Sequence, residues 1–567
     1  MHPESREGAR NLVHYLAIRK SDTNELRGSL RRLGLSSLAH AERNVLGSID
    51  AVEQALSRLS GADGVDPEEL GIALRRRNPT ADDHRRAILG PSPEGRDVSI
   101  MVTLPTEAAD NRALVEEMLA AGMNMARINT AHDDAVAWEK MIANVRQAAA
   151  DADVECRIIM DLAGPKLRTG ELKPGPRVIH IRPKRDPLGR VIAPRRVRLI
   201  PDDVLQRGTK IAVVPVDREC IEYAQEGDEI RFRDTRGKKR RMRVAVKDDK
   251  GLVLESFKGA YIATGSKLTL ARQETGEKLD YRVGELPAVE QPLLLHVGDR
   301  LIVHQANTPG EPAKEDADDV ILKPAHIACQ QPEVFDYLSP GETISLNDGK
   351  ISGVIRGASP EQLEVEITKA KPTGSRLRGQ RGINFPRSDI RLPGLTSVDK
   401  TNLEFVAKFA DAVSLSFIRK PADVELLLAE LDDLSASNLG LVIKVETKKG
   451  FKNLPKVMLA AMRRYPIAVM IARGDLAVEC GWERLAELQE EILWVCEAAR
   501  VPVMWATQVL EQEAKKGLPS RAEITDAAQS QRADCVMLNK GPHILAAIRT
   551  LDSILRRMQT LRFRKSS

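Results

Sequence analysis

Short apolar runs alternate with longer amphipathic stretches from about residue 98 onward. Eight runs of strand length stand there, at 98–104, 123–129, 156–162, 412–417, 441–445, 468–472, 501–506 and 535–538. Most are followed by apolar residues at helical spacing, for example in 111–121, 135–150, 422–434 and 484–499. Repeated strand-then-helix units predict parallel strand pairing, and eight of them predict a closed (β/α)8 TIM barrel. The predicted fold class is therefore α/β.

A long segment of different character interrupts the third of these units. It contains Gly-Asp and Pro-Gly turns between short alternating runs, for example at 229–233, 299–303 and 343–346. We therefore expect a large β-rich lid domain inserted after strand 3. A turn-then-strand pattern at 226–232 recurs at 340–346, which suggests a duplication within this domain.

The first part of the chain has neither of these patterns. Residues 5–60 carry apolar positions at helical spacing, so we expect an all-α N-terminal extension. The apolar stripe from Leu35 to Leu56 needs another apolar surface to pack against, and we expect these helices to cover the barrel. The stretch 61–97 has the Gly and Pro content of a linker. The predicted domains are 1–95 (helices and linker), 96–171 (first part of the barrel), 172–391 (lid domain) and 392–567 (second part of the barrel).

Composition excludes several classes of protein. The 567 residues are 42% hydrophobic and 29% charged, as in an ordinary globular protein. We find no membrane-spanning apolar run and no secretory signal, and therefore expect no membrane partner. The six cysteines lack the pair spacing of a zinc site, which favours reduced thiols and a cytoplasmic location.

Polar residues stand at the predicted carboxyl ends of several strands, where the active site of such a barrel lies. They are Arg127, Asn129, Asp161, Lys444, Glu446, Asp475 and Thr507. Any single one is more often a salt-bridged structural residue, but seven from five strands favour a common site. Glu446 and Asp475 could share a hard divalent cation such as Mg²⁺. Arg127 and Lys444 would hold phosphate or carboxylate oxygens.

Longer segments resemble the signature stretches of the pyruvate kinase family. They are Gly122-Met-Asn-Met-Ala-Arg-Ile-Asn, Met160-Asp-Leu-Ala-Gly-Pro-Lys-Leu-Arg-Thr-Gly, Ser416-Phe-Ile-Arg-Lys-Pro-Ala-Asp-Val, Lys444-Val-Glu, Ala472-Arg-Gly-Asp-Leu and Val503-Met-Trp-Ala-Thr-Gln-Val-Leu. Arg381-Gly-Ile-Asn-Phe-Pro is similar to part of that family's mobile lid domain. The resemblance covers residues 98–172 and 289–560.

This resemblance implies phosphoryl transfer from phosphoenolpyruvate to ADP, with Mg²⁺ (or Mn²⁺) as cofactor. It implies that Arg127 and Lys444 bind the phosphoryl group and the enolate, that Glu446 and Asp475 hold the metal, and that Thr507 lies beside the carbon that is protonated. It also implies a substrate and nucleotide side made of Asn129, His132, Asp161, Arg168, Arg381 and Gly474.

The sequence departs from the family pattern at three places. Ala131 and Lys166 stand where members that bind a monovalent cation carry a hydroxyl and an acidic residue. The ammonium of Lys166 can substitute for that cation, so we predict no K⁺ requirement. The eighth-strand motif, Met537-Leu-Asn-Lys-Gly-Pro, lacks the usual hydroxyl and carboxylate. Because the chain stops after the eighth helix, we expect no C-terminal allosteric domain, and a homo-oligomer through the barrel faces is left open.

Two other hypotheses remain. Residues 182–250 contain 20 Lys and Arg against 12 Asp and Glu, including Lys238-Lys-Arg-Arg. This could indicate a catalytically altered or inactive barrel that acts as a binding or regulatory protein. We favour a solvated face without a nucleic-acid partner, since the segment has only two aromatic residues, Tyr223 and Phe232. The other hypothesis is a phosphoenolpyruvate or pyruvate lyase. A lyase of that kind needs no nucleotide-binding residue, so it would not explain Arg168.

Overall fold

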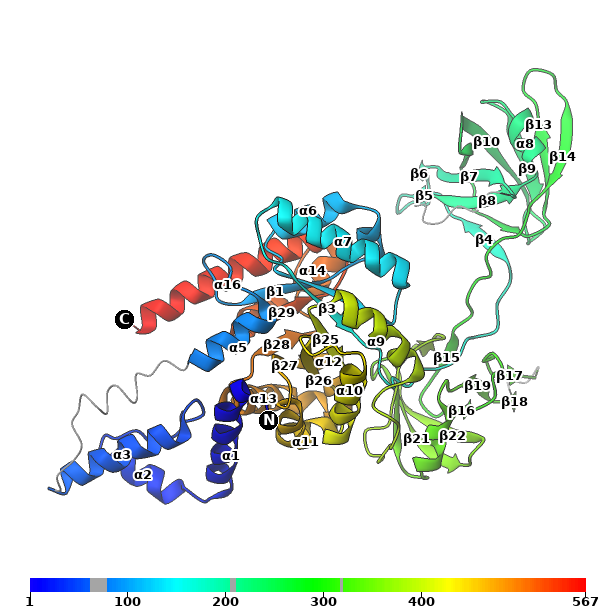
Figure 1. Ribbon diagram of the computed structural model, residues 1–567. Helices are drawn as coiled ribbons and strands as arrows, with labels where there is room; N and C mark the ends of the chain where they lie inside the picture. The colour runs from blue at the N-terminus through cyan, green and yellow to red at the C-terminus, as the bar shows by residue number, and fades with distance from the viewer. Residues whose placement is uncertain (62–78, 204–210, 317–319, 567) are drawn as a thin grey trace. The chain divides into compact units, whose positions relative to one another are not determined.

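A closed barrel of eight parallel strands forms the body of the protein (Figure 1). The computed structural model describes residues 1–61, 79–203, 211–316 and 320–566. The strands follow one another as β1 (Ser99–Thr103), β2 (Met125–Asn129), β3 (Arg157–Asp161), β25 (Ala412–Leu415), β26 (Gly440–Val445), β27 (Ile467–Ala472), β28 (Val503–Ala506) and β29 (Cys535–Leu538). The predicted TIM barrel is confirmed.

The register of the strands brings their polar ends together. Asn129 at the end of β2 pairs with Asp161 at the end of β3, and Asp161 pairs with Ser414 in β25. The strands are buried on almost every residue because helices cover their outer side, as expected for a parallel sheet.

The predicted amphipathic stretches form helices of the barrel, and several barrel helices begin at polar caps. Capping boxes join Thr396 to Asp399 and Ser520 to Glu523, which satisfies free N–H groups at these helix starts. The helices are α6 (Arg112–Ala120), α7 (Ala135–Asp151), α9 (Ser397–Phe409), α10 (Pro421–Asp433), α11 (Lys448–Ala461), α12 (Arg473–Cys480), α13 (Leu485–Ala499), α14 (Glu511–Lys516), α15 (Arg521–Gln529) and α16 (Ile544–Ser566).

The N-terminal extension is helical, as predicted, with α1 (Arg6–Lys20), α2 (Asn24–Arg32) and α3 (Val45–Leu59). Helix α1 lies against α13 of the barrel. The Asn11 side chain donates a hydrogen bond to the Ala498 carbonyl (2.9 Å). A Cβ atom at Gly8 would lie 2.1 Å from the Ala499 carbonyl oxygen, so glycine permits the close approach of the two helices.

A further helix, α5 (Pro79–Leu89), stands in the stretch that we predicted as a linker. Ile88 and Leu89 are 3% and 1% exposed and belong to the cluster of apolar residues inside the barrel, with Met101 and Met470. The prediction of a linker is therefore wrong for 79–89, because the buried residues His84, Ile88 and Leu89 fix a short helix amid turn-forming residues. Residues 62–78 of the stretch lie outside the described part of the chain.

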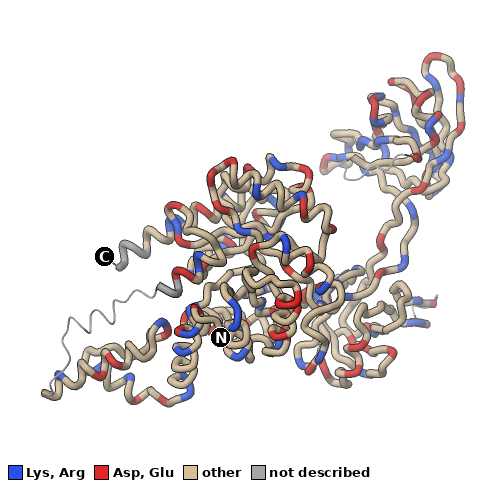
Figure 2. The backbone as a smooth tube through the Cα atoms, in the orientation of Figure 1, with Lys and Arg blue, Asp and Glu red and all other residues tan. Residues whose placement is uncertain are grey.

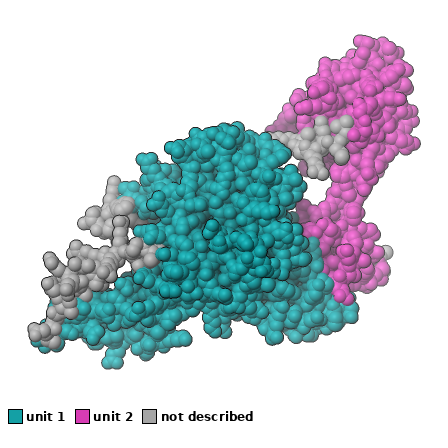
Figure 3. Space-filling model, in the orientation of Figure 1, with its two compact units in different colours: residues 1–168, 330–372, 381–567 teal, residues 169–329, 373–380 magenta. Residues whose placement is uncertain are grey.

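The insert between β3 and β25 is rich in strands, as predicted. Contacts divide the chain into two compact units (Figure 3): unit 1 holds residues 1–168, 330–372 and 381–567, and unit 2 holds 169–329 and 373–380. Strands β20 (Thr343–Leu346), β21 (Ile351–Ala358), β22 (Gln362–Lys369) and β24 (Ile383–Asn384) belong to unit 1. The predicted insert 172–391 thus contains parts of both units, and its duplication stays a prediction.

Unit 2 contains a seven-stranded sheet around its own apolar core. In sheet order its strands are β14 (Lys278–Arg282), β13 (Lys267–Ala271), β9 (Glu229–Arg233), β10 (Lys239–Asp248), β11 (Gly251–Ser256), β7 (Arg195–Pro201) and β8 (Ala212–Val216). Ile230 and Phe232 of β9 are buried, whereas Arg231 and Arg233 between and after them are exposed. This alternation is typical of a sheet with one solvated face.

The basic segment lies largely in this sheet. Arg241 stands opposite Arg231 on the paired strands β10 and β9, and Glu229 forms ion pairs with both. Figure 2 shows acidic and basic positions intermingled along these strands. Interspersed charges of both signs are what a solvated face requires, so the structure adds no support for a nucleic-acid partner.

Two further observations bear on the class of the protein. In the described part of the chain, no helix has both the length and the apolar character needed to cross a membrane. All six cysteines are free thiols, as the scattered spacing predicts.

Candidate active site

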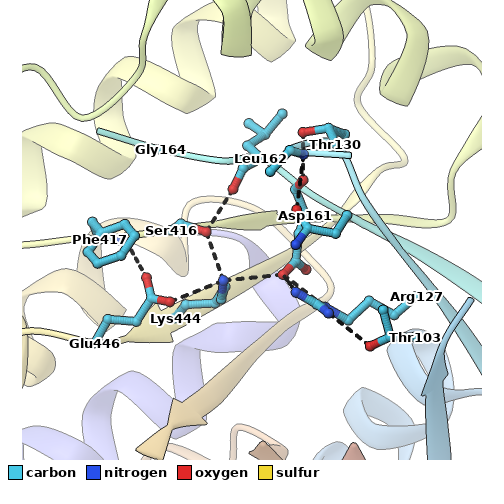
Figure 4. A network of polar contacts seen from close by, with 12 residues as sticks. Thr103, Arg127, Thr130, Asp161, Leu162, Gly164, Ser416, Phe417, Lys444 and Glu446 are labelled. Carbon is cyan, nitrogen blue, oxygen red and sulfur yellow. Dashed lines mark hydrogen bonds and ion pairs between the residues drawn. The ribbon is translucent and has the colours of Figure 1, made fainter. Parts of the chain in front are cut away.

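Asp161 is the centre of a buried polar network at the carboxyl ends of the barrel strands (Figure 4). Its Oδ2 accepts a hydrogen bond from Nε of Arg127 (2.9 Å) and lies 3.2 Å from Nζ of Lys444. Burial raises the pKa of Asp161, but Arg127 and Lys444 outweigh burial and hold that pKa below its ordinary value. An ionised Asp161 therefore fixes both cations in place.

Lys444 is 8% exposed and lies between two carboxylates. Its Nζ is 3.2 Å from Oε1 of Glu446, opposite the contact with Asp161, and donates a hydrogen bond to Oγ of Ser416 (2.8 Å). Burial lowers the pKa of Lys444, whereas Asp161 and Glu446 raise it, with a net increase. Lys444 therefore stays positively charged at the mouth of the barrel.

Glu446 connects this network to a strained turn. Its Oε2 accepts a hydrogen bond from the backbone N–H of Phe417 (2.6 Å). Phe417 has φ 57°, a left-handed conformation that costs an aromatic residue energy and is characteristic of functional sites. Burial raises the pKa of Glu446 and Lys444 lowers it, while the charge of Asp475 raises it further. Glu446 and Asp475 therefore lie close enough to repel each other.

Such a pair of carboxylates fits a hard divalent cation. Within the described ranges, no group of three or more His, Cys, Asp and Glu side chains could hold a metal. A metal at Glu446 and Asp475 would complete its shell with water and substrate oxygens, as Mg²⁺ does in sites of this kind. Nζ of Lys166 lies 3.1 Å from each oxygen of Asp475, so this lysine brings positive charge to the same carboxylates.

Thr507 lies in a tight turn that follows β28. Its hydroxyl accepts a hydrogen bond from the backbone N–H of Gly474 (2.8 Å), and its φ is 66°. This bond links two predicted site residues and brings Thr507 next to the residue that precedes Asp475. The hydroxyl proton of Thr507 remains available to a ligand or water.

Arg473, which our sequence analysis missed, stabilises this turn. The arginine is 6% exposed. Its guanidinium donates to the carbonyls of Ala506 (3.0 Å) and Thr507, pairs with Asp526, and lies 4.9 Å from the ring centre of Trp505. These contacts come from segments far apart in the sequence, so spacing gave no signal for them.

The predicted nucleotide side lies around the loop after β2. Asn129 ends the strand and its Oδ1 accepts a hydrogen bond from the Ala131 N–H (3.0 Å). Burial lowers the pKa of His132, and the positive charges of Lys540 and Arg168 lower it further. Lys540, which was not predicted as a site residue, comes from the unusual eighth-strand motif and adds a cation here.

Arg168 and Arg381 lie on neighbouring segments. The backbone of Arg168 forms a β-bridge with Gly382, next to Arg381. Ser416, another residue that we missed, directly follows β25, and its position at a strand end was a signal that could have identified it.

A comparison with protein families decides the family of this site. The family model described as "Pyruvate kinase, barrel domain" matches residues 95–187 and 241–542, well over half of the chain. The chain belongs to the pyruvate kinase family. The match ends before β7 and resumes inside β10, so the pyruvate kinase barrel model leaves out much of the basic sheet of unit 2.

Curated pyruvate kinases are similar to this chain at modest identity. "Pyruvate kinase" of Geobacillus stearothermophilus is 27% identical over 325 residues, which are 56% of this chain and 51% of that protein. "Pyruvate kinase" of Bacillus licheniformis is 29% identical over 249 residues, 43% of this chain and 41% of the relative. "Pyruvate kinase PKLR" of Homo sapiens is 32% identical over 232 residues, which are 40% of this chain and 39% of that protein. The chain spans about half the length or less of these relatives.

Proposed function

We propose that this protein transfers a phosphoryl group from phosphoenolpyruvate to ADP and so forms pyruvate and ATP. The buried position of Lys444 between Asp161 and Glu446, beside Arg127, is the observation that carries the proposal. A transferring phosphoryl group needs positioning and charge neutralisation more than covalent help from the protein. Arg127 and Lys444 supply two fixed positive charges, and Glu446 and Asp475 suit a divalent metal. Together they can position the phosphoryl group and neutralise its charge.

In this reaction the phosphorus–oxygen bond of phosphoenolpyruvate breaks, and a new bond forms to a terminal phosphate oxygen of ADP. The electron pair stays on the departing enolate oxygen, and a proton then adds to the methylene carbon. Arg127 would bind the phosphoryl oxygens by its planar guanidinium. Lys444 would neutralise negative charge on the phosphoryl group and on the enolate.

Thr507 would hold the water that delivers the proton, since its hydroxyl accepts a bond from Gly474 and can donate another. Arg473 would keep this turn in position. Asn129, His132, Arg168 and Arg381 would bind the nucleotide.

Glu446 and Asp475 would hold the divalent metal, Mg²⁺ or Mn²⁺, which supplies Lewis-acid stabilisation when bound. Lys166 pairs with Asp475, and we propose that its ammonium replaces a monovalent cation. K⁺ would then be unnecessary.

The competing hypotheses differ in what the reaction requires. A lyase would form pyruvate without ADP, and an inactive barrel would form none. The test is a coupled assay of pyruvate formation with phosphoenolpyruvate and Mg²⁺, with and without ADP and with and without K⁺. We expect a rate that depends on ADP and Mg²⁺ and is unchanged by K⁺. Pyruvate formation without ADP, or no formation at all, would contradict the proposal.

A further inference from the structure

A cavity of about 660 Å³ opens beside the candidate active site, with which it shares the wall residues Lys166 and Phe417. It lies among the loops that follow β3, β25 and β26 and the segment 383–392, all within unit 1. Arg127, Lys444 and Glu446 are not among its lining residues. Its size suits a small metabolite.

Cations dominate the polar lining of this cavity. They are Lys166, Arg387, Arg419, Lys448, Lys449 and Lys452, against the carboxylates Asp389 and Glu479. Glu479 accepts a hydrogen bond from Asn384 (2.9 Å), and burial raises its pKa above the ordinary value. Two carboxylates thus face six cations in this lining.

Three of the cations already have partners. Lys166 pairs with Asp475, Lys449 pairs with Asp389 at 2.5 Å, and Arg419 donates to two carbonyls of the segment 383–392. Arg419 is half-buried, and its contacts join that segment to the loop after β25. These residues build the wall of the cavity.

The other three cations form no contacts of this kind. Within the described residues, the side chains of Arg387, Lys448 and Lys452 form no hydrogen bond or ion pair, although they line one cavity. Lys448 and Lys452 are one turn apart at the start of α11, where the helix dipole adds positive potential. Like charges held together without ion-pair partners of their own favour an anionic ligand.

Apolar side chains form the other part of the lining. They include Leu167, Ile383, Phe385, Ile390 and Phe417. A bare inorganic anion would leave these surfaces in contact with water. An anion with an apolar body would cover them and still reach the three cations.

We propose that this cavity binds a small organic phosphate, a phosphomonoester dianion that carries an apolar group. Arg387, Lys448 and Lys452 bind the phosphate, and the apolar side chains bind the organic part. This binding site is separate from phosphoryl transfer and does not depend on the function proposed above.

Calorimetric titration of the full chain with phenyl phosphate, and in parallel with inorganic phosphate, tests the proposal. We expect phenyl phosphate to bind the wild type and Lys444→Met with similar affinity, because the cavity does not include the catalytic lysine. The double variant Lys448→Ala/Lys452→Ala should bind at least tenfold more weakly. Lys456→Ala, an exposed lysine one turn further along α11 and outside the cavity, is the matched control and should bind like the wild type.

Inorganic phosphate should bind more weakly than phenyl phosphate if the apolar lining contributes. Circular dichroism would show that the variants are folded, as expected for exposed lysines. Binding that is lost in Lys444→Met, or unchanged in the double variant, would assign the ligand to the catalytic mouth and overturn the proposal. Equal affinity for both anions would also overturn it.

Discussion

The ammonium of Lys166 lies 3.1 Å from both carboxylate oxygens of Asp475. It is also 5.3 Å from the ring centre of Phe417, whose N–H binds Glu446. Lys166 thus pairs directly with Asp475 and packs on the residue that binds Glu446. This arrangement is the basis of the proposal that the protein carries its own monovalent cation.

Lys166→Ala should make the proposed activity sensitive to K⁺. Without the ammonium, the charges of Glu446 and Asp475 are less well balanced, and a K⁺ ion can occupy the freed space. We expect kcat/KM to fall tenfold or more in K⁺-free buffer and to recover partly when K⁺ is added. Lys408→Ala, at an exposed position on α9, is the control. An equal loss at every K⁺ concentration would argue against the substitution of K⁺ by Lys166.

His84 should make folding stability depend on pH. Its Nε2 accepts a hydrogen bond from the Ile467 N–H (3.0 Å), and burial lowers its pKa from 6.5 to about 4. The unfolded chain therefore takes up a proton first, and stability falls as the pH drops from 6.5 towards 4. The loss should reach about 2 kcal/mol at pH 5, at about 1.4 kcal/mol per pKa unit.

Urea unfolding at pH 7 and pH 5 measures this effect. His84→Gln removes the titrating group and should reduce the difference in unfolding free energy between the two pH values. His40→Gln, at an exposed histidine, should leave that difference as in the wild type. If His84→Gln leaves the pH dependence unchanged, His84 is not its source.

Leu89→Ala should destabilise the protein strongly. Leu89 is 1% exposed among the side chains inside the barrel, so truncation leaves a cavity and costs about 2–5 kcal/mol. Leu59→Ala, at a position that is 67% exposed, should change the unfolding free energy by less than about 0.5 kcal/mol. Similar urea midpoints for the two variants would show that α5 does not close the barrel in solution.

Mixed nucleic acids should not bind the basic segment at physiological salt. Acidic residues such as Glu229 neutralise part of its charge, and true nucleic-acid binding weakens steeply with salt. An electrophoretic shift that disappears with added salt would contradict this expectation and revive the hypothesis of a binding protein.

The barrel could be predicted because its strands are almost wholly apolar runs. In such runs the charged residues Asp161, Lys444 and Glu446 stand out, since burying them is costly without partners. Their convergence follows from the rule that the strand ends of a barrel meet at one face.

The rest depends on contacts between distant residues. Arg473 acts through Trp505 and Asp526, which no local pattern connects to it. Among the described residues of helix α5, only Ile88 and Leu89 are large buried apolar residues, beside the buried His84, too few for a helical period of apolar positions. The limits of the two units depend on strand pairing across the insert, which hydrophobic alternation does not specify.

The effect of Lys444→Met on pyruvate formation shows whether the buried ammonium takes part in phosphoryl transfer. Methionine keeps an unbranched side chain that is one atom shorter and removes the charge between Asp161 and Glu446. With Lys456→Met as control and thermal melting to verify folding, the account predicts a fall in kcat of about 10²–10³-fold. A variant that stays folded and forms pyruvate at the wild-type rate would contradict the account.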